Sequence, residues 1–132
     1  MERTKSLVLI RAKHLAESVT TPMLLVDDEG TLVFYNEAAE ATLGLPFADL
    51  GPVPVSDWQE RFRVRSRDDA PFPLDAMPGW IELQKERPGT GHVRFTTAAG
   101  HDVFIAVCAF PLFTSERRFD GALVFFWEEP DT

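Results

Sequence analysis

The sequence has a single cysteine, Cys108, among its 132 residues. One thiol cannot form a disulfide within the chain, and His14, His92 and His101 show no spacing typical of zinc ligands. The N-terminal stretch MERTKSLVLIRAKH also lacks the long apolar core of a secretion signal. We therefore expect a cytoplasmic protein without a metal site.

Long apolar runs and positive charge are scarce as well. The longest apolar runs, MLLV and FIAVCAF, are far shorter than the roughly 18 residues of a membrane-spanning helix. With 13 Lys and Arg against 21 Asp and Glu the net charge is -8, and this sign repels phosphate groups. We expect neither a membrane nor a nucleic acid as a partner.

Enzyme motifs are also missing. The sequence has no Gly-x-Ser-x-Gly elbow, no glycine-rich phosphate loop and no His-Glu-x-x-His. The paired acids at residues 27–28 and 68–69 fall in expected turns, where water surrounds a carboxylate and leaves it untuned for acid–base catalysis. We expect that the protein is not an enzyme.

The chain does contain enough apolar material for one domain, since 45% of its residues are hydrophobic. We expect a flanking helix in residues 1–19, one domain in residues 20–129 and a tail at residues 130–132. In the flanking segment, apolar residues at spacings of 4, 3 and 4 predict an amphipathic helix over residues 5–19. The stripe consists of Val8, Ala12, Leu15 and Val19. It packs either on the domain's own sheet or on a second subunit.

Residues 23–35 predict a β-hairpin, because the β-prone runs MLLV and TLVFY flank the acidic turn DDEG. Asn36 then opens the run EAAEATL, which ends at Gly44. Asn is a strong helix N-cap and Gly supplies a left-handed C-cap, so we expect a helix of about two turns between them.

Residues 45–78 hold six of the ten prolines, which excludes long regular elements there. Short helices are expected over residues 56–62 and 75–86. Three strands follow, over residues 92–97, 103–113 and 119–127. The order of elements predicts an α+β fold: a five-stranded antiparallel sheet with short helices on one face, preceded by the amphipathic helix.

The last two strands are apolar on both faces, so the second face of the sheet needs a cover. The N-terminal helix or a partner subunit must supply it. We therefore predict a homodimer, and its contact face is expected to consist of Val8, Ala12, Leu15, Val19, Val124 and Phe126.

The stretch WQERFRVRSR gathers four cations, Arg61, Arg63, Arg65 and Arg67, at every second position. If this segment is extended, the four guanidinium groups share one face. The row is then either a solvated edge paired with the protein's own acids or a docking strip for an acidic partner.

In its order of motifs the sequence resembles a PAS domain, the small sensor and interaction fold of bacterial signalling proteins. The resemblance covers residues 18–128 and rests on MLLVDDEGTLVFYNEAAEATLG, PFPLDAMP, AAGHDVFIAVCAFPLF and DGALVFFWEE. It departs from the family where Asp68, Asp69 and Ala70 replace an Asp-Gly turn. The signalling helix that usually follows the fold is also missing after Glu129, so a stand-alone module is expected.

The resemblance implies that each PAS cofactor needs its own residue. Haem-binding members carry a His on the long helix, and residues 74–88 contain none. Photoactive flavin-binding members carry a Cys in the helical middle, whereas Cys108 is expected in a central strand. We expect neither cofactor.

The aromatic residues expected between sheet and helices either fill the interior or line a pocket for a small apolar ligand. The candidate pocket residues are Phe34, Trp58, Phe62, Met77, Trp80, Ile81, Phe95 and Phe104.

Two functions follow. The first is a PAS-type signalling module that forms homodimers, pairs with a signalling protein in trans and senses a small apolar ligand. The second is a small α+β enzyme similar to ketosteroid isomerase, with an apolar cavity. A buried Asp or His in a solvent-connected cavity would support the second.

Overall fold

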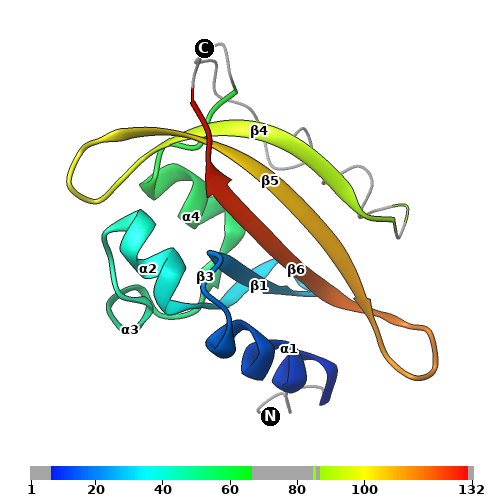
Figure 1. Cartoon of the computed structure of the whole chain (residues 1–132). Helices are drawn as coiled ribbons and strands as arrows, with labels where there is room; N and C mark the ends of the chain where they lie inside the picture. The colour runs from blue at the N-terminus through cyan, green and yellow to red at the C-terminus, as the bar shows by residue number, and fades with distance from the viewer. Residues whose placement is uncertain (1–6, 67–84, 86, 131–132) are drawn as a thin grey trace.

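The computed structural model describes residues 7–66, 85 and 87–130. In this part of the chain one antiparallel sheet has the strand order β3-β2-β1-β6-β5-β4 (Figure 1). The strands are β1 Met23–Asp27, β2 Thr31–Tyr35, β3 Val53–Pro54, β4 Gly89–Thr96, β5 Asp102–Phe113 and β6 Phe119–Glu128. The helices are α1 Leu7–Ser18, α2 Glu37–Leu43, α3 Phe47–Leu50 and α4 Val55–Arg61. The α+β class and the N-terminal helix are confirmed. The helix predicted over residues 75–86 lies, except for Lys85, outside the described residues.

The sheet has six described strands where five were predicted, because β3 adds a short edge strand. Thr31 pairs with Pro54 and Leu32 with Val53. The prolines of this segment had argued against long regular elements, and β3 has only two residues. Pro54 is tolerated because a residue on an edge strand can leave its outer side without an N–H donor.

The predicted hairpin and the helix that follows it are confirmed. Asn36 has extended backbone, and its side chain accepts the backbone N–H of Ala39, as an N-cap does. Gly44 ends the helix in the left-handed conformation, with φ 78°.

Asn36 also has a wider role than a cap. Its Oδ1 atom accepts the backbone N–H of Met23 at 3.0 Å, and its Nδ2 atom donates to the carbonyl oxygens of Ala16 and Thr21, each at 2.9 Å. One buried side chain therefore joins α1, β1 and α2.

The sheet separates two hydrophobic clusters. The inner cluster lies between the sheet and helices α2 and α4, and the outer cluster lies between the sheet and α1 (Figure 1). The inner cluster includes Leu24, Leu32, Tyr35, Ala39, Leu43, Trp58, Phe62, Val93, Phe95, Ile105 and Phe126. The outer cluster includes Leu9, Ala12, Ala16, Met23, Leu25 and Leu123.

The structure reverses the two faces that were assigned to β6. Phe126 is 2% exposed in the inner cluster and Val124 packs against it, whereas Leu123 and Phe125 belong to the outer cluster. Val124 and Phe126, which were predicted to be part of the dimer contact face, therefore lie on the side of the sheet opposite to α1. They do not belong to an outer contact face. A strand that is apolar on both faces shows which residues share a face, but not which face is covered by which helix.

Candidate interaction surface

The face of α1 that packs on the sheet consists of Leu9, Ala12 and Ala16. The predicted stripe lies to one side of this face. Val8 and Val19 are half-buried, and Leu15 is 52% exposed. Of this stripe, Ala12 belongs to the packed face, and Val19 packs on the outer cluster just beyond the end of α1. Val8 and Leu15 form a partly open flank of the helix.

The direction of this flank follows from Lys13. Its Nζ atom lies 5.1 Å from the centre of the Phe34 ring on β2. At 100° per residue, Lys13 and Leu15 project from opposite flanks of α1. Because the Lys13 flank faces β2, the Leu15 flank is turned toward β6 and β5.

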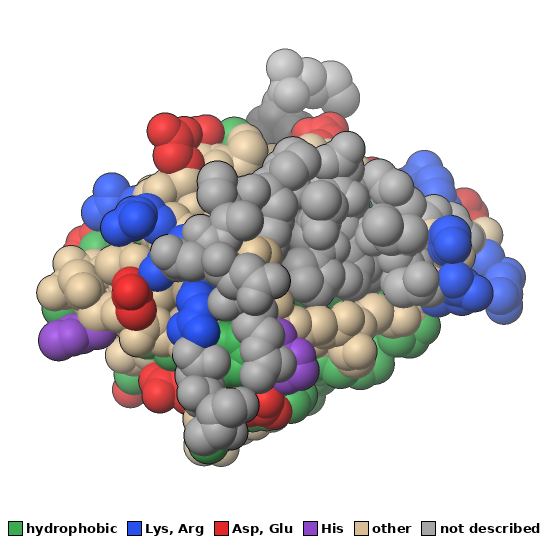
Figure 2. Space-filling model, turned by 90° about the horizontal axis from the view of Figure 1, so that it is seen from above, with side chains coloured by type: hydrophobic (Ala, Val, Ile, Leu, Met, Phe, Trp, Pro, Cys, Tyr) green, Lys and Arg blue, Asp and Glu red, His purple; other side chains and the backbone are tan. Residues whose placement is uncertain are grey.

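The outer face of β5 and β6 continues the apolar surface beyond α1. Phe110 is 37% exposed and Trp127 is 43% exposed. The Phe110 ring meets the half-buried ring of Phe125 edge to face, with 5.6 Å between centroids. In Figure 2, hydrophobic side chains gather along the lower edge of the molecule. We call Val8, Leu15, Phe110, Phe125 and Trp127 the outer strip.

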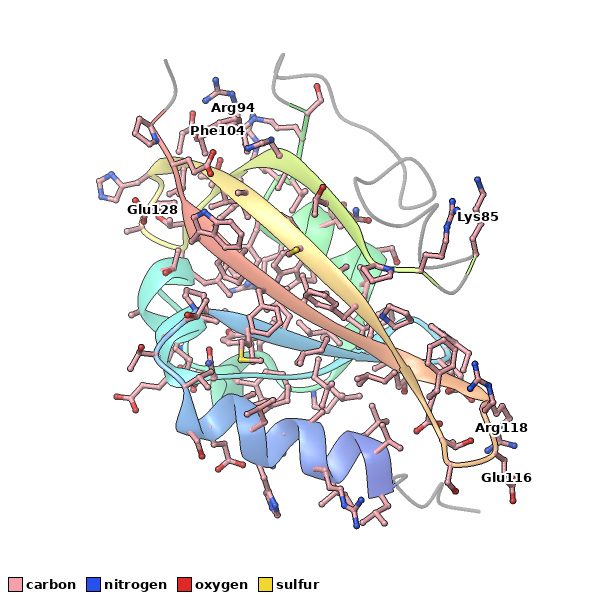
Figure 3. The ribbon with its side chains drawn as sticks, turned by 45° about the vertical axis from the view of Figure 1, so that its right-hand side comes forward. Lys85, Arg94, Phe104, Glu116, Arg118 and Glu128 are labelled. Atoms are coloured by element: carbon pink, nitrogen blue, oxygen red, sulfur yellow. The ribbon has the colours of Figure 1, made fainter. Side chains whose placement is uncertain are left out.

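One end of the outer strip is fixed by a small polar network. The Nε2 atom of His92 lies 2.9 Å from Oε2 of Glu129, and the indole N–H of Trp127 donates to Oε1 of Glu129 at 3.3 Å. The His92 ring stacks on the Phe104 ring at 5.4 Å, and the Arg94 guanidinium lies 5.2 Å from the same ring (Figure 3). The Glu129 carboxylate therefore connects the end of β6 with β4 across the intervening strand β5.

Of the five predicted pocket residues that the structure describes, three lie together in the interior. Trp58, Phe62 and Phe95 belong to the inner cluster, and Phe62 meets both other rings. Phe34 packs on the outer cluster, and Phe104 lies on the outer side with His92. Met77, Trp80 and Ile81 lie outside the described residues. A shared pocket of all eight residues is therefore excluded.

Two buried donors on α4 have no acceptor among the described residues. They are Nε1 of Trp58 and Nε2 of Gln59, and both side chains are at least nine-tenths buried. A buried donor without an acceptor costs roughly 1–3 kcal/mol. An acceptor oxygen placed beside them would remove that cost.

Tyr35 closes the inner cluster next to α3. Its hydroxyl donates to the carbonyl oxygen of Leu45 at 2.6 Å, and its ring meets Phe47 edge to face. Burial, and then the negative charge of Glu40, raise the pKa of Tyr35 to about 12. The hydroxyl therefore stays protonated and serves as a structural donor.

The predicted arginine strip is not formed. Arg61 ends α4, Arg63 has a left-handed φ of 49°, and Arg65 is 6% exposed. The segment is therefore not extended, and these residues share no exposed face. Arg67 lies outside the described residues.

Arg65 instead fastens this segment to the sheet. Its backbone exchanges two hydrogen bonds with Arg94, each 2.9 Å long. Its guanidinium lies 3.0 Å from Oδ1 of Asp102 and donates to Oγ1 of Thr96 at 3.2 Å. The Thr96 hydroxyl donates to the same Asp102 oxygen at 2.9 Å. The hydrogen bond from Thr96, followed by that from Arg65, holds the pKa of Asp102 below its usual value.

One buried carboxylate bears on the enzyme alternative. Asp120 is 1% exposed, and its Oδ2 atom has no hydrogen-bond partner within the described residues. It is closed off from solvent, and no His, Cys, Asp or Glu cluster suited to a metal occurs in the described ranges. Within the described residues, no side chain pairs with the Oδ2 atom of Asp120 as a partner in acid–base catalysis would.

A family model described as "PAS domain" matches residues 10–81, which is more than half of the chain. The chain belongs to the PAS domain family. Members of this family are typically signalling sensor modules and generally not enzymes. A comparison with curated proteins found no match to the sequence.

Solved PAS structures share the fold over nearly the whole chain. A PAS domain from Colwellia psychrerythraea is 15% identical, with a TM-score of 0.67 over 95% of this chain and 99% of that one. The PAS domain of nitrogen regulation protein NR(II) from Vibrio parahaemolyticus is 17% identical, with a TM-score of 0.62 over 95% and 100%. An RNA-binding light-oxygen-voltage receptor is 14% identical, with a TM-score of 0.71. The match covers 99% of this chain and 36% of the receptor chain. At these identities the likeness concerns the fold.

Sequence reasoning missed three residues of this PAS domain that the structure singles out. They are Trp127, Gln59 and Asp120, none of which was named as a candidate site residue from the sequence. Alternation along β6 could have paired Trp127 with Phe125, but burial of Gln59 and Asp120 depends on contacts far along the chain.

No described helix combines the length and apolar character needed to cross a membrane.

Proposed function

We propose that this PAS domain signals by forming a homodimer through the outer strip and by pairing with a signalling protein in trans. The observation that carries the proposal is the exposure of Leu15 on the α1 flank that faces the open half of the sheet, where Phe110 and Trp127 are also exposed. Exposed aromatic and aliphatic side chains on neighbouring elements are typical of protein interfaces. We also infer a cytoplasmic location, which fits the unpaired Cys108.

Two matched variants test the homodimer by sedimentation velocity. Leu15→Glu and Ile10→Glu each place an acid at an exposed apolar position of α1, but Ile10 projects away from the Leu15 flank. Leu15→Glu should weaken self-association at least about tenfold, since a carboxylate would be buried in the contact. Ile10→Glu should leave self-association unchanged. Equal dimerisation of both variants would contradict the proposed contact.

A ligand in the interior is the second candidate, and it rests on the donors of Trp58 and Gln59, which have no acceptor within the described part of the chain. We propose a small, largely apolar molecule with one oxygen acceptor, because a purely apolar ligand would leave both donors without a partner. Native mass spectrometry of the purified protein should then show a bound small molecule. The adduct should be lost or weakened in Trp58→Phe and kept in Thr42→Val, a control on α2. A protein that is free of adducts after incubation with a metabolite extract would contradict this candidate.

A further inference from the structure

Strand β4 is the last described strand at one edge of the sheet, where β5 is its neighbour (Figure 1). Across this edge the backbone of Arg94 exchanges two hydrogen bonds with Arg65, so the N–H and C=O groups of Arg94 point away from β5. In an antiparallel pair, residues two apart direct their backbone groups to the same side. The register of β4 with β5 has no shift, so the backbone groups of His92 and Thr90 also point outward.

These outward groups are open within the described part of the chain. The backbone of Thr90 and that of His92 make no hydrogen bond on this side, and both residues are exposed. Each residue therefore presents one N–H donor and one C=O acceptor at the edge. A row of such groups is complementary to another extended backbone.

The open part of β4 also lacks the features that usually protect a strand edge. Proteins protect such edges with charged residues, with proline or with β-bulges. Residues 89–93 read GTGHV, and their pairing with β5 contains no bulge. The opposite edge strand, β3, has two residues, one of which is Pro54. Of these two edges, β4 is therefore the one suited to the addition of a strand.

We propose that this edge binds a short extended peptide segment of another protein, which joins the sheet as a strand antiparallel to β4. The proposal rests on the proposed pairing with a signalling protein in trans and adds the place and the mode of binding. The segment exchanges both backbone hydrogen bonds with Thr90 and both with His92. It ends before Arg94, because Arg65 already occupies the edge there.

The neighbours of the added strand indicate which side chains it carries. Thr90 lies opposite Cys108 on β5, and Cys108 lies opposite Phe125 on β6. Because Phe125 packs on the outer cluster, these three side chains form an uncharged row across the outer face. The residue of the segment that faces Thr90 extends this row. Val, Ile or Thr suits that position, since β-branched side chains pack well beside their strand neighbours.

A second copy of β4 fits this edge less well than a separate segment does. An antiparallel pair that joins Thr90 to His92 of the partner subunit places Pro88 of the partner subunit beside Arg94. That place is held by Arg65. A pairing shifted by two residues meets either Arg94, which is already bonded to Arg65, or Pro88, which has no N–H to donate.

A synthetic peptide tests the proposal by NMR on the wild-type chain. The probe is acetyl-Lys-Thr-Val-Thr-Val-Thr-Lys-amide, a β-prone segment with a lysine at each end for solubility. In the free protein, the amides of Thr90 and His92 should exchange with solvent at least about tenfold faster than those of Gly91 and Val93, which face β5. The peptide should bind with a dissociation constant of about 1 mM or below and should slow the exchange of Thr90 and His92.

N-methylated forms of the peptide separate backbone pairing from side-chain contact. Methylation of alternate residues leaves the donors of one edge of the peptide intact and should preserve binding. Methylation of all five central residues removes the donors of both edges, keeps every side chain and should abolish binding. Binding of the fully methylated peptide would overturn the proposal.

Thr90→Pro and Thr90→Val are matched variants of the edge. Proline removes the outward N–H of Thr90 without breaking a bond to β5, and its ring obstructs the approaching strand. Thr90→Pro should weaken peptide binding at least about tenfold, whereas Thr90→Val keeps the N–H and should bind as the wild type does. Equal binding by the two variants would overturn the proposal, and the methylated peptides decide it if Thr90→Pro does not fold.

The outcomes separate this proposal from the proposed function. If about 5 mM peptide leaves Thr90 and His92 unchanged, strand addition at β4 is overturned and the homodimer through the outer strip still stands. If the chain binds the peptide but stays monomeric, the homodimer is overturned and strand addition still stands. Exchange of Thr90 and His92 that slows with protein concentration alone would show that two β4 edges pair with each other, which would also overturn the proposal.

Discussion

At the scale of single residues, Asn36 shows how far a local pattern reaches. The sequence marks it as a helix cap because the acceptor and the N–H that it satisfies lie three residues apart. Its bonds to Ala16 and Thr21 span 20 and 15 residues, and no local pattern contains them. The cap could therefore be predicted, whereas the connection of α1 to the domain required the fold.

Asn36→Asp separates these two roles. The carboxylate keeps acceptors for the N–H groups of Met23 and Ala39 but loses the donor to Ala16 and Thr21. We expect a loss of about 2 kcal/mol in the free energy of unfolding and faster hydrogen exchange in α1 than in β5 and β6. Thr42→Val, which removes one hydrogen bond within α2, should cost less than about 1 kcal/mol and leave α1 unaffected. Uniformly faster exchange in Asn36→Asp would contradict the role in positioning α1.

Gly121 is required for a different physical reason. It has a φ of 145°, and a methyl group at this position would collide with the carbonyl oxygen of Val26 on the paired strand. Gly121→Ala should therefore lower the free energy of unfolding by roughly 3 kcal/mol. Gly100 has a φ of 89° and open space around it, so Gly100→Ala should cost only about 1 kcal/mol. Urea unfolding that ranks the two variants equally would argue against the close approach of β1 and β6.

At the scale of elements, the arginine row and the faces of β6 show where periodicity fails. An alternating pattern predicts one shared face only if the backbone is extended, and the left-handed residue Arg63 breaks that condition. For β6 the period was predicted correctly, and the faces were reversed because both are apolar. The hairpin, the cap and the strand alternation were predictable, since each depends on neighbours within a few residues.

The link from Arg65 to the β4–β5 turn gives a prediction for pH dependence. The pKa of Asp102 is lowered in the folded state, so its contribution to stability is present above the ordinary carboxyl pKa of about 3.9 and is lost as the pH falls through the lower folded value. In the Asp102→Asn variant, the urea concentration at the unfolding midpoint should therefore decrease less steeply than in the wild type as the pH falls below about 4. Thr96→Val should act in the same direction, because it removes the hydrogen bond that lowers this pKa most. An unchanged acid slope in both variants would contradict the network.

At the scale of the whole molecule, the sheet has one closed face and one face that α1 covers only in part. The inner face is closed by α2 and α4, while Phe110 and Trp127 stay exposed beside α1. The sequence predicted that the second face needed a cover. It could not predict how much of that face α1 would cover, because this depends on the position that Asn36 and the outer cluster impose on the helix.

The most direct measurement of the central claim is hydroxyl-radical footprinting of the wild-type protein over a range of concentrations. Radical labelling reports the solvent exposure of individual side chains, so it locates a contact as well as detecting one. As the protein associates, labelling of Trp127, Phe110 and Leu15 should fall together, while labelling of Ile10 stays constant. Labelling of Trp127 and Phe110 that does not change between the monomer and the associated form would contradict a contact through the outer strip.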